Sequence, residues 1–154
     1  MRKASAIGHL SFRRKWCIYL ASAGVWLTGI VWLLYHYFFR TTDSYGFARA
    51  LPGEHYALVA HAAFGFAAIW FFGVLWPVHV KGSWRVRIRR GTGGTLFAFT
   101  LWLTLTGFLL YYLGSDFWRH ADSLAHWIVG IAGVAPFAVH LLTRAPRNES
   151  AAAS

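Results

Sequence analysis

Residues 55–80 read HYALVAHAAFGFAAIWFFGVLWPVHV, a run of 26 positions without Asp, Glu, Lys or Arg. Three more runs lack these residue types: 16–39, 91–115 and 123–143, of 24, 25 and 21 residues. A helix needs roughly 20 apolar residues to cross the hydrocarbon core of a bilayer. Because the four runs hold 96 of the 154 residues, most of the chain is predicted to lie in lipid. This composition excludes a soluble enzyme, a nucleic-acid-binding module and a disulfide-stabilised scaffold.

The apolar runs predict an all-α membrane protein, a four-helix up-down bundle, because irregular backbone cannot face lipid. The expected spans are about 16–39, 55–80, 92–114 and 123–143. A basic segment, 1–15, precedes the membrane domain 16–143, and the Ala- and Ser-rich tail 144–154 is expected to be disordered. The first run is too long for the apolar part of a signal peptide and has no clear cleavage site, so we interpret it as a helix. Pro77 and Pro136 should bend the second and fourth helices.

Basic residues are distributed unevenly among the segments that flank the spans. Twelve lie in the N-terminal segment, the 81–90 segment and the tail, whereas only Arg40, Arg49 and Arg119 lie in the other two loops. Basic residues in short loops stay on the cytoplasmic side, so both termini are predicted to be cytoplasmic. The single Cys17 excludes an internal disulfide and a CxxCH haem attachment, and we expect it to be a small buried apolar residue.

The two halves of the chain share a repeated pattern. Leu27-Thr28-Gly29 in the first span matches Leu105-Thr106-Gly107 in the third, and each leads to a Leu-Leu-Tyr sequence. His55-x5-His61-x3-Gly65 opens the second span, and His120-x5-His126-x3-Gly130 opens the fourth. Since the first and third spans run outward and the other two inward, the halves are predicted to be parallel two-helix repeats. Such repeats bring equivalent residues of the second and fourth spans face to face.

Histidines are the candidate functional residues, because ionisable groups inside a membrane are commonly functional. At about 100° per residue, His61 and His79 share one face of the second helix, and His126 and His140 lie within about 40° of each other on the fourth. We therefore expect His61 to oppose His126 near the outer surface and His79 to oppose His140 near the inner surface. Two facing imidazoles are what a bis-histidine haem iron requires, and helix bundles hold such cofactors in their cores.

Glycines accompany these histidines. Gly65 and Gly130 lie one turn after His61 and His126, where a side chain would crowd a macrocycle, and Gly133 lies on the same face of the fourth helix. We therefore include all three glycines in the predicted haem site. Small residues also let plain helices pack closely, which is the alternative interpretation of each.

Other roles for the histidines stay open. An intramembrane histidine is often a hydrogen-bond partner in helix packing, and His79 and His140 also suit an interfacial position near the basic segments. Three histidines at the outer boundary are expected to be solvated there, with a quinone contact or alternative ligation as the other role: His36, His55 and His120. His9 carries no signal. Zinc is disfavoured, since no Cys or acidic residue joins the histidine pairs and structural zinc takes four ligands.

The second and fourth spans resemble the ligand helices of small membrane di-haem b-type cytochromes, the group that includes the cytochrome b561 and hydrogenase cytochrome b subunits. LTGFLLYY at 105–112, followed by Arg119, His126-x3-Gly130 and His140, is similar to short four-helix bacterial relatives. The resemblance covers roughly residues 16–143. It implies a bacterial inner-membrane location and two non-covalent haems b, one near each membrane face.

The resemblance further implies a b-type cytochrome that carries electrons between the quinone pool and a periplasmic cytochrome c or other redox subunit. Arg119 on the outside, and Lys81 and Arg85 on the inside, are candidate partners of the haem propionates, or solvated loop charges. The loops are too short for a catalytic domain, so substrate chemistry would belong to another chain. The main alternative is a haem-free four-span scaffold or assembly subunit. A small transporter is less consistent with the sequence, because the spans carry no charged residue near the middle of the membrane. The sequence leaves open whether the protein forms a homodimer.

Overall fold

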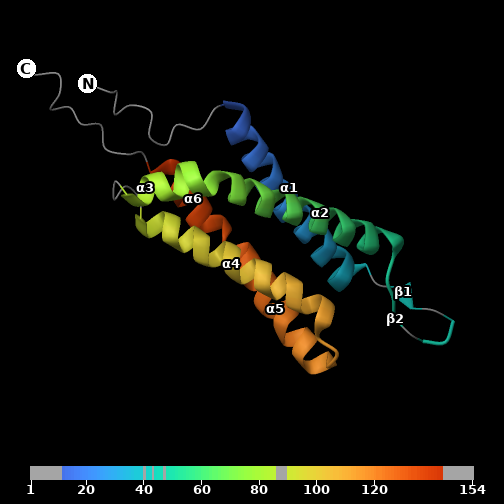
Figure 1. Ribbon diagram of the computed structural model, residues 1–154. Helices are drawn as coiled ribbons and strands as arrows, with labels where there is room; N and C mark the ends of the chain where they lie inside the picture. The colour runs from blue at the N-terminus through green and yellow to red at the C-terminus, as the bar shows by residue number, and fades with distance from the viewer. Residues whose placement is uncertain (1–11, 40, 43, 47, 86–89, 144–154) are drawn as a thin grey trace, which may run out of the picture. The chain divides into compact units, whose positions relative to one another are not determined.

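The computed structural model describes residues 12–39, 41–42, 44–46, 48–85 and 90–143 (Figure 1). The chain divides into two compact units, Met1–His79 and Val80–Ser154, which we describe separately. Several positions with sequence-based expectations lie outside the described residues: the basic residues before Phe12, His9, Arg40, Arg87, Arg89 and the tail from residue 144.

The first unit is an antiparallel pair of helices, α1 (Phe12–Phe38) and α2 (Pro52–Leu75), which lie side by side in Figure 1. A short hairpin joins them, in which β1 (Thr41–Thr42) pairs antiparallel with β2 (Ala48–Arg49). Gly46 turns this hairpin with a φ of 85°, a conformation that glycine adopts without a steric penalty. A π-helical turn, η2 (Trp76–Val80), continues α2 and leads toward the second unit.

The second unit is also a helical hairpin. It begins with the short helix α3 (Lys81–Arg85), followed by α4 (Arg90–Tyr112). Helices α5 (Asp116–Ala132) and α6 (Val134–Leu142) then return along α4, and both contact it.

Four helical segments are long and apolar enough to cross a membrane, which confirms the predicted helical membrane character of the chain. They are Phe12–Phe38, Pro52–Leu75, Arg90–Tyr112 and Asp116–Leu142. All four segments begin earlier than the charge-free runs, because charged residues can occupy helical turns that extend beyond the hydrocarbon. The charged segment 116–122, predicted to be a loop, accordingly forms the first turns of α5. The β1–β2 hairpin was not predicted either.

Both prolines coincide with a change in helical hydrogen bonding. Pro136 has no N–H to offer the carbonyl four residues earlier, and its ring crowds that carbonyl, which belongs to Ala132. The chain separates α5 from α6 immediately after this residue, at Gly133. Pro77 lies within the π-helical turn η2, where the wider turn replaces the regular α-helical bonding.

Few residues are buried in either unit and most of them are small, while large apolar side chains face outward. Among the described residues only six are buried: Ala21, Gly24, Glu54, Ala57, Thr106 and Gly133. In contrast, Phe66 and Trp70 of α2 are 74% and 71% exposed, as expected for side chains that contact lipid. Cys17 is exposed on α1, so the expectation that it is buried was wrong. Small apolar residues need not be buried where lipid rather than water surrounds the helix.

Glycines allow close contacts at three levels between α1 and α2. Phe64 of α2 packs directly over Gly24, and the Tyr35 ring lies against Gly53, where an added Cβ would come within 2.5 Å of the ring. Between these levels, an added Cβ at Gly29 would lie 3.1 Å from Cε1 of His61. Since none of these rings could hold its position beside a larger residue, the glycines determine how closely the two helices approach.

Replacing Gly24 with alanine should destabilise the first unit, because Phe64 occupies the space that the new methyl group needs. We expect a loss of about 1–3 kcal/mol, the usual cost of overpacking. The matched control is Gly73→Ala on α2, where nothing lies within 4 Å of an added Cβ. That change should be neutral or stabilise by up to about 1 kcal/mol. Unfolding of both variants in mixed detergent micelles measures the difference, and equal stabilities would contradict the packing described here.

Candidate functional site

His61 of α2 is oriented by a hydrogen bond to the backbone of α1. Its Nδ1 lies 2.9 Å from the carbonyl oxygen of Val25. Because a carbonyl only accepts hydrogen bonds, Nδ1 must carry the hydrogen, and the lone pair of the neutral ring is then on Nε2. Gly29 leaves room for the ring, since a Cβ there would stand 3.2 Å from Nδ1 and press against the imidazole. Thr28 Oγ1 lies at 3.4 Å from the same nitrogen.

His126 of α5 is held in a similar way by a threonine of α4. Thr106 Oγ1 donates to the carbonyl oxygen of Trp102 at 2.9 Å, which uses its only hydrogen. The same oxygen lies 2.8 Å from Nδ1 of His126 and accepts the Nδ1 hydrogen in the tautomer that keeps the bond to Trp102. In this tautomer the lone pair of the ring is again on Nε2. Gly107 lies beside the ring, with an added Cβ 3.3 Å from Cε1.

The same local arrangement therefore occurs once in each unit. In both, the Thr-Gly pair of a Leu-Thr-Gly motif lies against the second histidine of a His-x5-His motif on the neighbouring helix. In both, Nδ1 donates its hydrogen within the unit and Nε2 retains the lone pair. The two units thus use the same ring nitrogen of equivalent histidines for the bond between their helices. Hydrogen bonding through the other ring nitrogen is the usual way in which proteins orient a metal-ligating histidine.

The second predicted pair is positioned differently. His140 of α6 is partly buried, and its Nδ1 lies 3.0 Å from Thr92 Oγ1 near the start of α4. His79 is partly buried on the π-helical turn η2. Each residue of a π-helix turns through less than the 100° assumed for an α-helix, so α-helical spacing does not fix the face of His79 relative to His61.

The three glycines of the predicted haem site differ in their surroundings. An added Cβ would meet nothing within 4 Å at Gly65, and only Leu103 at 3.8 Å beside Gly130. Space for a larger group therefore exists at both. Gly133 is buried against Phe99, whose ring lies 3.2 Å from the position of an added Cβ. Packing of α4 against the α5–α6 segment is sufficient to explain Gly133.

Arg119 closes the turn between α4 and α5. Its Nε and Nη2 donate to the carbonyl oxygen of Leu113, at 3.1 and 2.7 Å, and so cap the end of α4. Arg90 makes the equivalent contact with the Trp84 carbonyl at the end of α3. This structural role accounts for Arg119 without a ligand, and its pairing with a haem propionate stays a prediction. Lys81 is exposed on α3.

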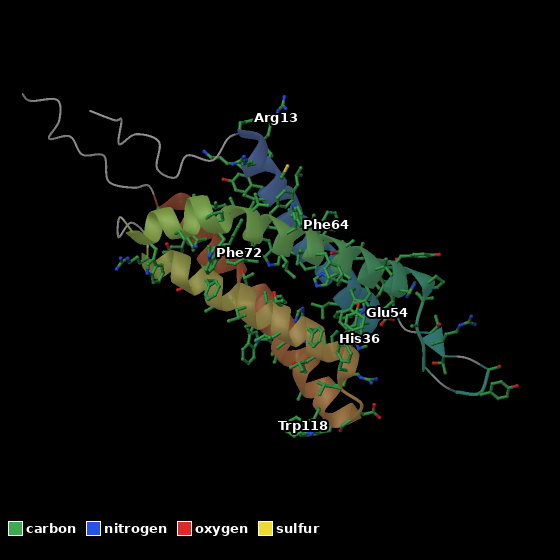
Figure 2. All side chains as sticks on the ribbon, viewed as in Figure 1. Arg13, His36, Glu54, Phe64, Phe72 and Trp118 are labelled. Carbon is green, nitrogen blue, oxygen red and sulfur yellow. The ribbon has the colours of Figure 1, made fainter. Side chains whose placement is uncertain are left out.

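A pair that was not predicted lies at the end of the first unit where α1 finishes and α2 begins. Nδ1 of His36 lies 2.8 Å from Oε1 of Glu54, and Figure 2 shows the two residues together at this end. A signal was available in the sequence, because residues equally distant from the turn of a helical hairpin face each other. By contrast, His55 and His120 are exposed, as expected for residues at a membrane surface.

No set of three or more His, Cys, Asp or Glu side chains able to hold a metal ion occurs among the described residues. No protein-family model, curated protein or solved structure matches the chain.

Replacing Thr106 with valine should destabilise the second unit, because the Nδ1 hydrogen of His126 loses its acceptor. We expect a loss of about 0.6–2 kcal/mol, the range for hydrogen bonds between membrane helices. Thr104→Val is the matched control, since exposed Thr104 bonds only the Thr100 carbonyl of its own helix, at 2.8 Å. A double-mutant cycle with His126→Ala isolates the pair, and the Thr106→Val loss should vanish in that background. An undiminished loss would show that the hydroxyl acts independently of the histidine.

Proposed function

We propose that the protein is a membrane b-type cytochrome, which carries electrons between the quinone pool and a periplasmic redox partner through bis-histidine haems. The observation that supports this most is the shared orientation of His61 and His126. Each has Nδ1 bonded within its own unit and the lone pair on Nε2. A neutral imidazole with its second nitrogen hydrogen-bonded is the form in which histidine ligates haem iron.

The residues around these histidines suit a large planar cofactor. Space beside Gly65 and Gly130, one turn from His61 and His126, is where a bulkier side chain would obstruct a macrocycle. When bound, haem supplies a one-electron couple between ferric and ferrous iron. The Nδ1 hydrogen bonds would hold the two imidazoles in fixed planes, and apolar side chains would surround the cofactor and exclude water.

His79 and His140 are the ligands that we assign to a second haem, on the predicted inner side. The Thr92–His140 contact supports this assignment, because a threonine hydroxyl again meets Nδ1 of a histidine on the neighbouring helix. Lipid contact by four apolar helices is consistent with a carrier that works inside a membrane and exchanges electrons with a lipid-soluble quinol. A homodimer is compatible with this function and not required by it.

The haem-free scaffold is the competing function, since Nδ1 hydrogen bonds also stabilise helix packing. The two functions differ in what they require of Nε2. A packing histidine needs only its Nδ1 bond, so a residue that keeps this bond would replace it. A ligand histidine also needs the lone pair of Nε2, so the same replacement would abolish haem binding.

Pyridine haemochrome analysis and dithionite-reduced spectra of the detergent-purified protein test the proposal. We expect two haems b per chain in the wild type, and one or none in His126→Ala or His61→Ala, because a missing axial ligand removes the haem that it holds. His126→Asn should lose haem in the same way, although the asparagine amide can still donate to Thr106 from near the position of Nδ1. His120→Asn is the matched control and should retain both haems, since His120 is exposed on the surface.

A colourless wild type, after expression with ample haem, would contradict the cytochrome proposal and favour the scaffold. Unchanged haem content in the His61 and His126 variants would contradict the ligand assignment instead. If both single variants lose the same spectral component, the two histidines serve one haem, as the repeat predicts.

A further inference from the structure

The His36–Glu54 pair combines burial with charge in a way that helix packing alone does not require. Glu54 is the one buried carboxylate among the described residues, with its side chain 11% exposed, and that of His36 is 28% exposed. Their atoms Oε1 and Nδ1 are 2.8 Å apart. Burying a charged group is unfavourable unless a partner compensates it, and His36 is the partner of Glu54.

The second unit lacks an equivalent pair, although it contains the same His-x5-His motif. When His55 and His61 are aligned with His120 and His126, the position of Glu54 is occupied by Arg119. Arg119 caps the Leu113 carbonyl instead of pairing with a histidine. A helical hairpin of this design therefore forms without a His–Glu pair, and the pair is a specialisation of the first unit.

The hydrogen bond gives the pair a defined chemistry. A carboxylate accepts the Nδ1 hydrogen of His36, so Nε2 is the basic nitrogen of the ring. A proton taken up at Nε2 creates an imidazolium ion that the adjacent carboxylate stabilises, as in the general bases of hydrolytic enzymes. Trp32 stacks on the imidazole, with centroids 4.6 Å apart and planes at 20°, and Tyr37 contacts it edge-on at 5.0 Å. These aromatic contacts fix the plane of the proton acceptor.

The position of the pair in the helices bears on which molecule could donate a proton to it. His36 lies in the last turn of α1 and Glu54 in the first turn of α2, at the end of the apolar helices that is predicted to face outward. At this position a molecule dissolved in the bilayer can bring a polar head to the pair, and the proposed cytochrome function requires a lipid-soluble reductant that releases protons. Hydroquinones meet both conditions.

We propose that His36 and Glu54 form the proton-accepting end of a hydroquinone site, an inference that rests on the proposed cytochrome function. Oxidation of one hydroquinone to the quinone breaks two O–H bonds and releases two protons and two electrons. Nε2 of His36 takes the first proton, and the carboxylate of Glu54 takes the second. The two electrons would pass one at a time to the haems that His61, His126, His79 and His140 would hold, each of which would accept one electron. Both protons then leave to water through the exposed part of His36, which restores the pair.

Two substitutions separate proton acceptance from structure. Glu54→Gln keeps the size and the acceptor oxygen of the side chain but removes the carboxylate. His36→Asn keeps a donor near the position of Nδ1, which preserves the bond to Glu54, and removes the basic Nε2. Asp116→Asn is the matched control, because it makes the same acid-to-amide change at an exposed position of the second unit.

The experiment follows haem reduction by decylubiquinol and by menadiol in the full-length protein in lipid nanodiscs. With haem content and dithionite-reduced spectra equal to wild type, we expect both variants to be reduced about 100-fold more slowly, the usual effect of losing a general base. Asp116→Asn should match the wild type. Decylubiquinol binding to protein already reduced with dithionite is the second readout, and the variants should bind about 10-fold more weakly because a charge-assisted hydrogen bond is lost.

The outcomes separate this inference from the proposed function. Wild-type protein without haem would contradict the cytochrome proposal itself. Haem-containing variants that are reduced at the wild-type rate would overturn the role of the pair and leave the cytochrome proposal intact. Loss of haem or of folding in both variants would assign the pair to the structure of the hairpin, and failure of both quinols to reduce the wild type would exclude a hydroquinone site.

Discussion

A polar side chain in a lipid-facing helix must find its hydrogen-bond partner within the protein, because hydrocarbon offers none. The packing of both units follows from this constraint. His61 reaches the Val25 carbonyl of the neighbouring helix, and His126 reaches Thr106. Each contact requires two helices to approach closely, which small residues such as Gly29 allow. Large apolar side chains are then left on the outside, where they meet lipid rather than a protein core.

The same hydrogen bonds connect packing to the proposed chemistry. A bond through Nδ1 stabilises the helix pair and at the same time leaves the lone pair of the imidazole on Nε2. The two units share this hydrogen bond, yet their residues differ nearer the start of the second helix of each hairpin. Glu54 pairs with His36 in the first unit, whereas Arg119, at the equivalent sequence position, caps a helix in the second. In the proposed cytochrome, the equivalent histidines His61 and His126 would hold the cofactor. The His36–Glu54 pair, which occurs in the first unit, would accept protons.

Charge-free runs predicted the spans well because hydropathy is a local property of the chain. The ends of the helices were less predictable: α5 begins at Asp116, since hydrogen bonding continues the helix past the point where the apolar run stops. The α-helical spacing of His61 and His79 also failed to anticipate η2, because it assumed one rotation per residue across Pro77. The prolines had marked both places where the helical geometry changes.

The sequence by itself determined the helical class and the number of apolar spans, and it identified the histidines as candidate ligands. These properties depend on composition and on residue spacing along a single helix, and both can be read directly from the sequence. Only the tertiary structure decided which atoms meet: Nδ1 of His61 with the Val25 carbonyl, and His36 with Glu54. The reason is that hydrogen-bond partners between helices depend on the rotation and separation of the pair. Those are set by the sum of many side-chain contacts and not by any single motif.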